Sequence, residues 1–262
     1  MTSVSNISIG AKLAGAAAAD ARHGMNEAIA RLSTGKRTMY GGDAAAQAMA
    51  DSIKAKGMSF AVAARNAEDG LSVAQTIESS LMEIASLAQR LREVAIQADN
   101  ASVQSTSDIT ALDAEAAAIT KAMALIVETT KFNGKSLMDT ADIDLAIGVT
   151  DSGNFTTISS QLVADASATV TAAGAETQAD NILADVGEGL GNVAAAMTVL
   201  KARQAVAYSA SANMMAAASR LQDTDFAASS ANLAKFSILN QSAMAMVAQA
   251  NQSQSAVLAV LQ

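Results

Sequence analysis

The sequence contains no cysteine, no proline and no tryptophan, and only 3% of its residues are aromatic. A single histidine, His23, excludes a histidine-based catalytic triad and a metal site with several histidines. The absence of cysteine is compatible with any compartment and suits an extracellular chain that has to avoid stray disulfides. Glycine is missing from residues 71–133 and 192–262, so nothing interrupts helix formation there, and both stretches are predicted to be long helices.

Basic residues are also scarce. The 17 lysines and arginines face 25 acidic residues, which gives a formal net charge of −8. No cluster of basic side chains occurs, and this argues against binding of nucleic acid. Residues 1–15 begin polar and uncharged, unlike the basic start and continuous apolar stretch of a cleavable signal peptide. If the protein leaves the cell, we expect it to use another route.

Apolar residues recur near the N-terminus in alternating steps of three and four, the spacing of a narrow seam on an amphipathic helix. A helix is therefore predicted from about Ser5 to Ser33, and the breaks that follow make Asp43 the expected N-cap of the next helix. The predicted seam consists of Val4, Ile7, Ala11, Ala14, Ala18, Ala21, Met25, Ala28 and Leu32.

The middle of the chain changes character. Helical spacing resumes from Asp43 through Arg65, continues over residues 71–99, and returns over residues 109–126 as an antiparallel partner. Alternating apolar residues over 143–149 and 155–159 then predict a β-hairpin around the turn "TDSGN". Residues 164–180 are low in bulk and predict a connection over the surface, after which helix resumes at about Asn181.

The last helix has a matching seam, formed by Leu233, Phe236, Ala243, Val247, Ala250, Val257 and Leu261. The predicted fold is thus mainly α: a long antiparallel helical bundle or coiled coil from both chain ends, with one small β-hairpin mid-chain. The N-terminal seam is mainly alanine, and each alanine buries little surface. We expect the two end helices to remain loose in the monomer and to become ordered when several copies pack together.

Residues Phe236 to Gln262 contain no charged side chain, which is compatible with a membrane anchor or with a helix buried by other protein. A membrane span needs about 20 predominantly apolar residues. Asn240, Gln249 and Gln254 are among several amides here that would each need a partner within lipid. The amides favour a helix surrounded by protein, and no membrane insertion is expected.

Several segments resemble bacterial flagellins: "MNEAIARLSTGKR", "ARNAEDGLSVAQTIESSLMEIASLAQRLREVAIQA", "TTKFNGKSLMD" and "SRLQDTDFAASSANLAKFSILNQ". The resemblance implies a structural subunit of the extracellular flagellar filament, in a short form that lacks the variable outer domains. It implies an inner coiled-coil domain from residues 1–42 and 220–262. Residues 43–180 would supply the N-terminal helices and hairpin of an outer helical domain, and residues 181–219 its C-terminal helix.

The resemblance also implies partners. These are further copies of the chain, a secretion chaperone, the export apparatus, and the cap and junction proteins of the filament. A host innate immune receptor is a further implied partner, through a segment that matches the family's receptor epitope. Its residues are Gln89, Arg90, Leu91, Arg92, Glu93, Val94 and Gln97. From the residues alone, Arg90, Arg92 and Glu93 form either a solvated face with local ion pairs or a contact between subunits.

Two further readings remain open: a hook–filament junction protein with similar ends, and a cytoplasmic signalling coiled coil. An enzyme is not expected, because no catalytic constellation and no cofactor site emerge. The acidic pairs Glu68/Asp69 and Asp223/Asp225 resemble helix caps more than general acid–base groups. The glycines of "GEGLGN", residues 187–192, lack the strand that precedes a phosphate-binding loop and predict only a flexible helix start.

Overall fold

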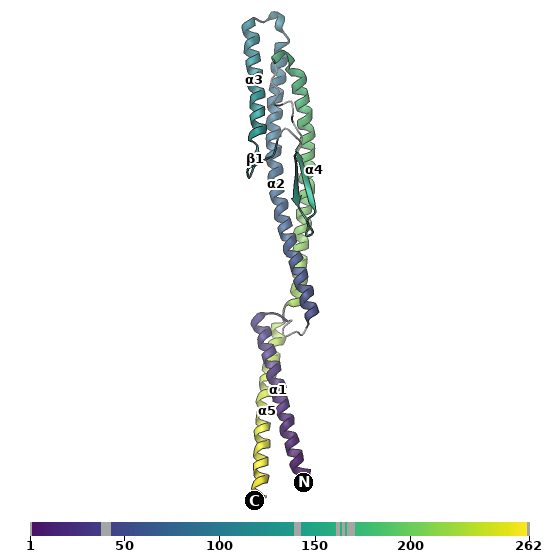
Figure 1. Cartoon of the computed structure of the whole chain (residues 1–262), viewed down its shortest axis with the longest axis vertical. Coiled ribbons are helices and arrows are strands. Elements are labelled where there is room, and N and C mark those ends of the chain that lie inside the picture. The colour runs from purple at the N-terminus through teal and green to yellow at the C-terminus, as the bar shows by residue number, and fades with distance from the viewer. Residues whose placement is uncertain are drawn as a thin grey trace. The chain divides into compact units, whose positions relative to one another are not determined.

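A computed structural model describes residues 2–37, 43–138, 143–160, 163, 166 and 171–260. It confirms a mainly helical fold in which long helices from both ends pack together (Figure 1). The five α-helices of this part of the chain are α1 (Thr2–Thr34), α2 (Ala44–Ala98), α3 (Thr106–Thr129), α4 (Ala175–Gln222) and α5 (Phe226–Val260). Two short 3₁₀ turns are η1 (Ala101–Val103) and η3 (Ala172–Gly174).

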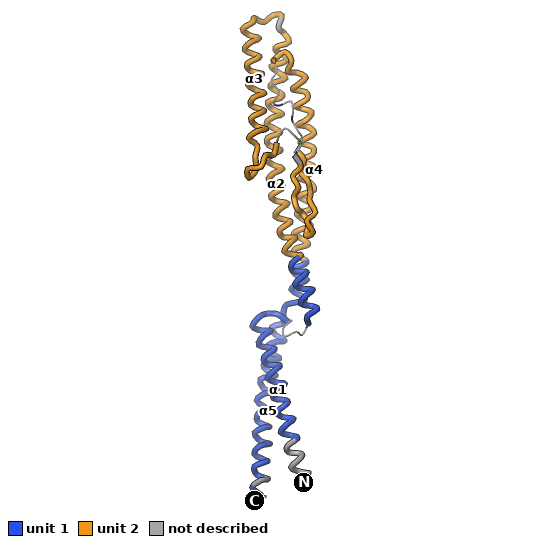
Figure 2. The backbone as a smooth tube through the Cα atoms, viewed as in Figure 1, with its two compact units in different colours: residues 1–55, 214–262 blue, residues 56–213 orange. Residues whose placement is uncertain are grey.

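The chain forms two compact units, which Figure 2 colours separately. One comprises residues 1–55 and 214–262 and holds α1 and α5. The other comprises residues 56–213 and holds α3, both β-hairpins and most of α2 and α4. The finer domain boundaries expected after residues 42, 180 and 219 stay predictions.

The helix starts follow capping chemistry. The Asp43 carboxylate accepts a hydrogen bond from the Ala46 amide at 3.0 Å, which confirms Asp43 as the cap of α2. The Asp225 carboxylate accepts from the amides of Ala227 and Ala228 at 2.8 and 3.0 Å, at the start of α5. At the start of α3, Ser105 and Asp108 form a capping box, in which each side chain accepts a hydrogen bond from the other's backbone amide.

The core of the second unit lies where α2, α3, α4 and the mid-chain hairpin meet. The apolar residues of α2 recur at the three- and four-residue spacing seen in the sequence, so one face of the helix is buried along its length. The largest fully buried side chains are Ile77, Leu81, Ile84, Leu91, Val94, Met123, Leu137, Ile158, Ile182, Val186, Val193 and Leu200.

The predicted mid-chain hairpin is present as β3 (Ile143–Gly148) paired antiparallel with β4 (Phe155–Ser160). Leu145 lies opposite Ile158, and both side chains are buried against the helices, so this face of the hairpin completes the core. The Asn66 side chain of α2 donates a hydrogen bond to the Gly148 carbonyl at 3.1 Å and so ties the end of β3 to α2.

A second, shorter hairpin pairs β1 (Lys131–Phe132) with β2 (Lys135–Ser136). Its turn residues, Asn133 and Gly134, have φ of 50° and 78°, which asparagine and glycine tolerate best. From sequence, "TTKFNG" predicted only the end of a helix. The two-residue strands are too short to show an alternating pattern, so only the Asn-Gly pair could have indicated them.

The structure differs from prediction in the connection before α4. Ala166 and Ala172 are buried in the core cluster, as is Val163 shortly before them, whereas residues 164–180 were expected to form a surface connection. The Ala172 amide donates a hydrogen bond to the Asp113 carboxylate of α3 at 2.8 Å, which fixes the segment against the bundle. Helix α4 begins at Ala175, so the glycines of residues 187–192 lie inside it and the predicted helix start there was wrong.

Candidate functional site

Helices α1 and α5 pack against each other in opposite directions, so that the beginning of α1 lies beside the end of α5 (Figure 1). Their shared seam is made of the smallest side chain that still favours helix. Its most buried members, each at most 4% exposed, are Ala14, Ala18, Ala21, Ala28 and Ala243. Alanine seams let helix backbones approach closely but bury little apolar area.

The structure places the remaining residues of the two predicted seams as follows. Half-buried positions next to the alanines are Ala11, Met25, Leu32, Leu233, Phe236, Val247 and Ala250. The side chains of Val4, Ile7 and Val257 lie outside the described part of the structure, as does Leu261. The described seam residues are therefore brought together, while their role in assembly stays a prediction.

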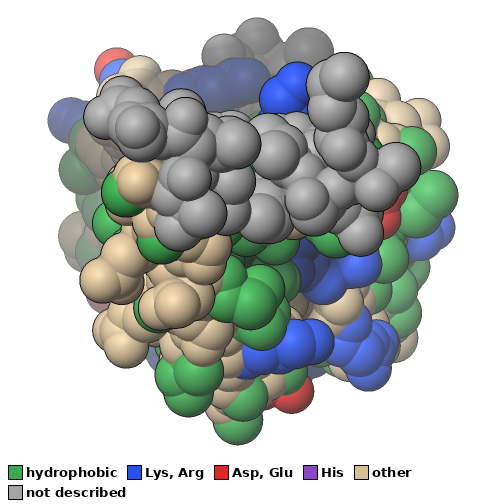
Figure 3. Space-filling model, turned by 90° about the horizontal axis from the view of Figure 1, so that it is seen from below, with side chains coloured by type: hydrophobic (Ala, Val, Ile, Leu, Met, Phe, Trp, Pro, Cys, Tyr) green, Lys and Arg blue, Asp and Glu red, His purple; other side chains and the backbone are tan. Residues whose placement is uncertain are grey.

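Bulky apolar side chains point away from this seam. Leu13 is 71% exposed and Ile238 is 64% exposed, and the others in this outward set are Ile9, Ile29, Phe226, Leu239 and Met244. Figure 3 shows hydrophobic side chains reaching the surface between polar and basic ones. The seam analysis missed this set because it followed one face of each helix. The signal was nevertheless present, since α5 carries apolar residues on every side and no charge beyond Lys235.

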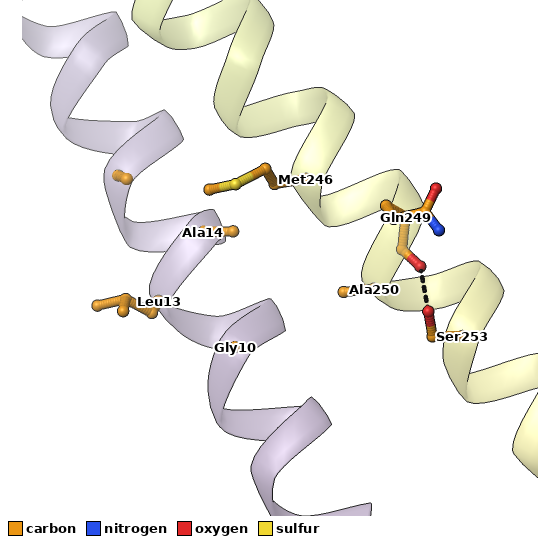
Figure 4. Close-up of a pocket in the computed structure, with 8 residues that line it drawn as sticks. Gly10, Leu13, Ala14, Met246, Gln249, Ala250 and Ser253 are labelled. Atoms are coloured by element: carbon orange, nitrogen blue, oxygen red, sulfur yellow. Dashed lines mark hydrogen bonds between the residues drawn. The ribbon is translucent and has the colours of Figure 1, made fainter.

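Near the free ends, the two helices enclose an apolar groove of about 630 Å³ (Figure 4). Met246 reaches across it toward α1, while Leu13 points away from α5. The other lining residues are Gly10, Ala14, Ala17, Gln249, Ala250 and Ser253. The Ser253 hydroxyl donates to the Gln249 carbonyl at 2.9 Å, so one polar group of the groove is satisfied within α5 itself. What remains on the groove surface is mainly hydrocarbon.

At the opposite end, backbone hydrogen bonds hold the two terminal helices together. The Arg37 amide donates to the Gln222 carbonyl at 2.7 Å, and the Thr224 amide donates to the Gly35 carbonyl at 2.9 Å. The Arg37 guanidinium also donates to the Leu221 carbonyl at 3.0 Å. Gly35 has a φ of 69°, which favours glycine where α1 ends. These hydrogen bonds therefore hold the end of α1 next to the start of α5.

The segment from Gln89 to Gln97 divides into two faces. Leu91 and Val94 are buried in the core of the second unit, whereas the charged and amide side chains are exposed. Arg90 pairs with Glu115 of α3 at 2.7 Å and with Glu93 at 2.8 Å. Hydrogen bonds from Arg90 to these carboxylates, chiefly Glu115, raise the pKa of Arg90. The exposed face of this segment is therefore linked to α3.

Arg92 makes the corresponding link to α4, with Asp180 at 2.8 Å and Glu176 at 3.6 Å. Local ion pairs are thus present on the exposed face, as one reading of the sequence predicted. Exposed pairs of this kind contribute only about 0–1 kcal/mol each, so they orient side chains more than they stabilise the fold.

The acidic pairs singled out in the sequence have different roles. Asp225 is a cap, as expected, and Asp223 forms an isolated β-bridge with Lys36. Glu68 lies inside α2 and is not a cap: it accepts hydrogen bonds from Tyr208 at 2.7 Å and Gln204 at 2.8 Å. The hydrogen bond to Glu68 raises the pKa of Tyr208. Glu68 therefore connects α2 to α4.

Among the residues that the structure describes, no group of three or more histidine, aspartate or glutamate side chains is placed to hold a metal ion. Within the same residues, none of the helices is sufficiently long and apolar to span a membrane. The unit that holds α1 and α5 has three features: the two helices are joined at one end, they pack through a narrow alanine seam, and bulky apolar side chains face outward.

Two protein-family models match the chain. The model of the bacterial flagellin N-terminal helical region matches residues 8–142, and that of the C-terminal helical region matches residues 170–261. The chain belongs to the bacterial flagellin family. Flagellins are structural proteins, so the chain is a filament subunit and not an enzyme, and the extracellular flagellar filament is its location.

Individual flagellins match over nearly their whole length. The flagellin of Halalkalibacterium halodurans is 35% identical over 250 residues, covering 90% of this chain and 91% of the relative. Those of Bacillus subtilis and Listeria monocytogenes are 30% and 29% identical, each covering 88% of this chain and about nine-tenths of the relative. The short form is thus shared with these flagellins, and the family implies self-polymerisation into the filament.

Proposed function

We propose that α1 and α5 are the elements through which this flagellin polymerises, and that they become fully ordered only in the filament. The observation that carries the proposal is the distribution of side-chain size in the terminal unit. The pair buries mainly alanine, whereas Leu13, Ile238 and Met246 remain more than half exposed. A helix with apolar residues on all sides is normally surrounded by protein, so further copies of the chain are its expected neighbours.

The physical basis is a balance between ordering entropy and buried area. Fixing the backbone of a long helix is costly, and an alanine seam with one partner returns little free energy. Additional copies would bury the bulky side chains as well, so each helix gains most of its stability on incorporation. Folding and assembly are then coupled, and loose ends suit a chain that passes through a narrow export channel before it polymerises.

The absence of charge from Phe236 to Gln262 has the same origin. An ionised group placed between helices at the centre of a polymer would lose its hydration without a partner. Amide side chains such as Asn240 and Gln249 can instead exchange hydrogen bonds with neighbouring copies or with water inside the filament. The uncharged stretch therefore fits an interior position in an assembly.

The resemblance to flagellins implies further partners. A secretion chaperone would cover the apolar faces of α5 before export, and the export apparatus, cap and junction proteins would receive the chain afterwards. For the segment from Gln89 to Gln97, we propose that Arg90, Arg92 and Glu93 contact neighbouring subunits or a host innate immune receptor. Their exposure supports this proposal, whereas Leu91 and Val94 are buried and would contribute only indirectly.

The test compares polymerisation with monomer stability. Deleting residues 236–262 is expected to leave a helical monomer that forms no filaments. Val247→Asp, at a half-buried seam position, is expected to raise the critical concentration for polymerisation at least tenfold while leaving the circular dichroism of the monomer unchanged. Val247→Thr is the matched control, because it keeps the side-chain shape without a charge. Normal filaments from the truncated chain, or equal effects of Val247→Asp on monomer and polymer, would contradict the proposal.

A further inference from the structure

One contact between the terminal helices differs from all the alanine contacts around it. The aromatic ring of Phe236 on α5 lies directly over Gly24 on α1. A Cβ added to Gly24 would meet three ring atoms, Cζ at 2.6 Å and Cε1 and Cε2 at 2.7 Å. Carbon atoms in contact normally lie 3.5–4.0 Å apart, so any other residue at position 24 requires the Phe236 ring, which is the far end of a flexible side chain, to move away from its place over Gly24.

The other two glycines of α1 show that this fit is specific to one position. A Cβ added to Gly10 or to Gly15 would meet nothing within 4 Å. All three glycines weaken α1, since glycine is less favourable than alanine inside a helix. Only at Gly24 does the structure show a reason for tolerating that cost, because only there does a side chain of the opposite helix occupy the missing volume.

Helix α5 needs such a feature because hydrophobicity alone does not select the face that packs on α1. Beyond Lys235 it has no charged residue, and apolar side chains such as Ile238, Leu239 and Met244 occupy faces other than the buried one. A rotation of α5 about its own axis would exchange one apolar face for another. The β-bridge between Lys36 and Asp223 joins the chain just after α1 to the chain just before α5, but it does not fix the rotation of α5 a dozen residues further on.

We infer that the ring of Phe236, seated on Gly24, selects which face of α5 packs against α1, and thereby which apolar side chains remain outside for other copies. With the ring on Gly24, Ala243 is buried and Ile238, Leu239 and Met244 face outward. If α5 is rotated about its own axis, the ring swings off Gly24, and the contact that it makes there is lost. The packing of α5 on α1 is inferred independently of the proposed function. Only its consequence for polymerisation rests on the proposed role of the terminal helices.

Because the chain has no cysteine, engineered pairs can report the rotation directly. Ala28 and Asn232 line the same small cavity beside Phe236, so Ala28→Cys with Asn232→Cys reports the native face. Ala28→Cys with Ala234→Cys reports a rotated helix, since position 234 lies roughly 200° around the helix from position 232 and hence on the opposite side of α5. Disulfide yield after mild oxidation is measured by mass spectrometry, in filaments where variant chains are diluted into unmodified ones so that assembly defects do not prevent the measurement.

Gly24→Ala is expected to lower the yield of the native pair at least fivefold, to raise that of the rotated pair, and to raise the critical concentration about tenfold. Gly15→Ala is the matched control on the same helix and should leave both yields unchanged. Phe236→Leu, which keeps apolar bulk without the ring, should also lower the native yield. Adding Gly24→Ala to it should cause little further loss, because the two residues act through one contact.

Three results would overturn the inference: wild-type disulfide yields in Gly24→Ala, equal losses in Gly24→Ala and Gly15→Ala, or fully additive losses in the double variant. These three results differ from the result that would refute the proposed function. If the chain truncated after residue 235 polymerised normally, the role of α5 in assembly would be refuted, whereas the disulfide yields of the full chain would still report how α5 packs on α1.

Discussion

Leu91 provides a test of which side chains in the segment from Gln89 to Gln97 stabilise the fold and which are available at the surface. Its side chain is completely buried, in a core to which α2, α3 and α4 all contribute. Leu91→Ala removes the equivalent of three carbon groups, worth about 0.8 kcal/mol each in lost burial, and leaves a cavity whose cost is added. We expect the free energy of unfolding to fall by about 3 kcal/mol.

The neighbouring arginines provide the contrast. The side chains of Arg90 and Arg92 are 53% and 45% exposed, and their ion pairs with α3 and α4 lie at the surface. Solvent screens such pairs, so Arg90→Ala and Arg92→Ala should each change the free energy of unfolding by less than about 1 kcal/mol. If they contact neighbouring subunits, as proposed, their main effect will be a raised critical concentration for polymerisation.

Urea denaturation of the monomer, followed by circular dichroism, measures the first quantity, and sedimentation of filaments measures the second. The expected pattern is a large loss of monomer stability for Leu91→Ala and a small one for the arginine variants. Leu91→Ala within 0.5 kcal/mol of the unmodified chain would refute the reasoning from burial. A loss for Arg90→Ala as large as that for Leu91→Ala would refute the assignment of the arginines to the surface.

Three other predictions concern turns and caps. Hydrogen bonds from Ser105 hold the pKa of Asp108 below its ordinary value of 3.8, so this stabilisation is present above that pH and is lost as pH falls through the lowered pKa. Ser105→Ala should therefore raise the Asp108 pKa in a carboxyl NMR titration and destabilise the monomer more at pH 6 than at pH 2; an unchanged pKa would contradict the capping geometry. Asp225→Ala removes the cap of α5 and should cost about 1 kcal/mol in thermal unfolding, whereas Asp225→Asn should retain most of the stability. Gly134→Ala forces alanine to a φ of 78° and should cost about 1 kcal/mol in urea denaturation, and a stabilising effect would rule out the left-handed turn.

Much of the fold could be predicted because it depends on local periodicity. The spacing of apolar residues in α2 indicated its buried face, and Asp43 marked where that helix begins. The β3–β4 hairpin was visible in the alternation around Leu145. The connection before α4 was predicted wrongly because Ala166 and Ala172 are small residues that show no helical or strand spacing, and only their position over the core shows that they are buried.

The candidate assembly surface could be predicted only in part. Sequence spacing identified the alanine seam, since seam residues recur with the helical period. It did not identify Ile9, Leu13 or Ile238 as an outward set, because on a helix with apolar residues all round the period does not distinguish the paired face from the free one.

The sequence by itself determined the helical class, the uncharged and alanine-rich ends, and the resemblance to flagellins, because these depend on composition, short-range spacing and linear motifs. Only the tertiary structure decided which side chains lie between α1 and α5 and which face outward. That choice depends on the fit of Phe236 over Gly24, two residues more than 200 positions apart in the chain. Steric complementarity at such a distance leaves no periodic trace in the sequence, and it becomes visible only when the two helices lie side by side.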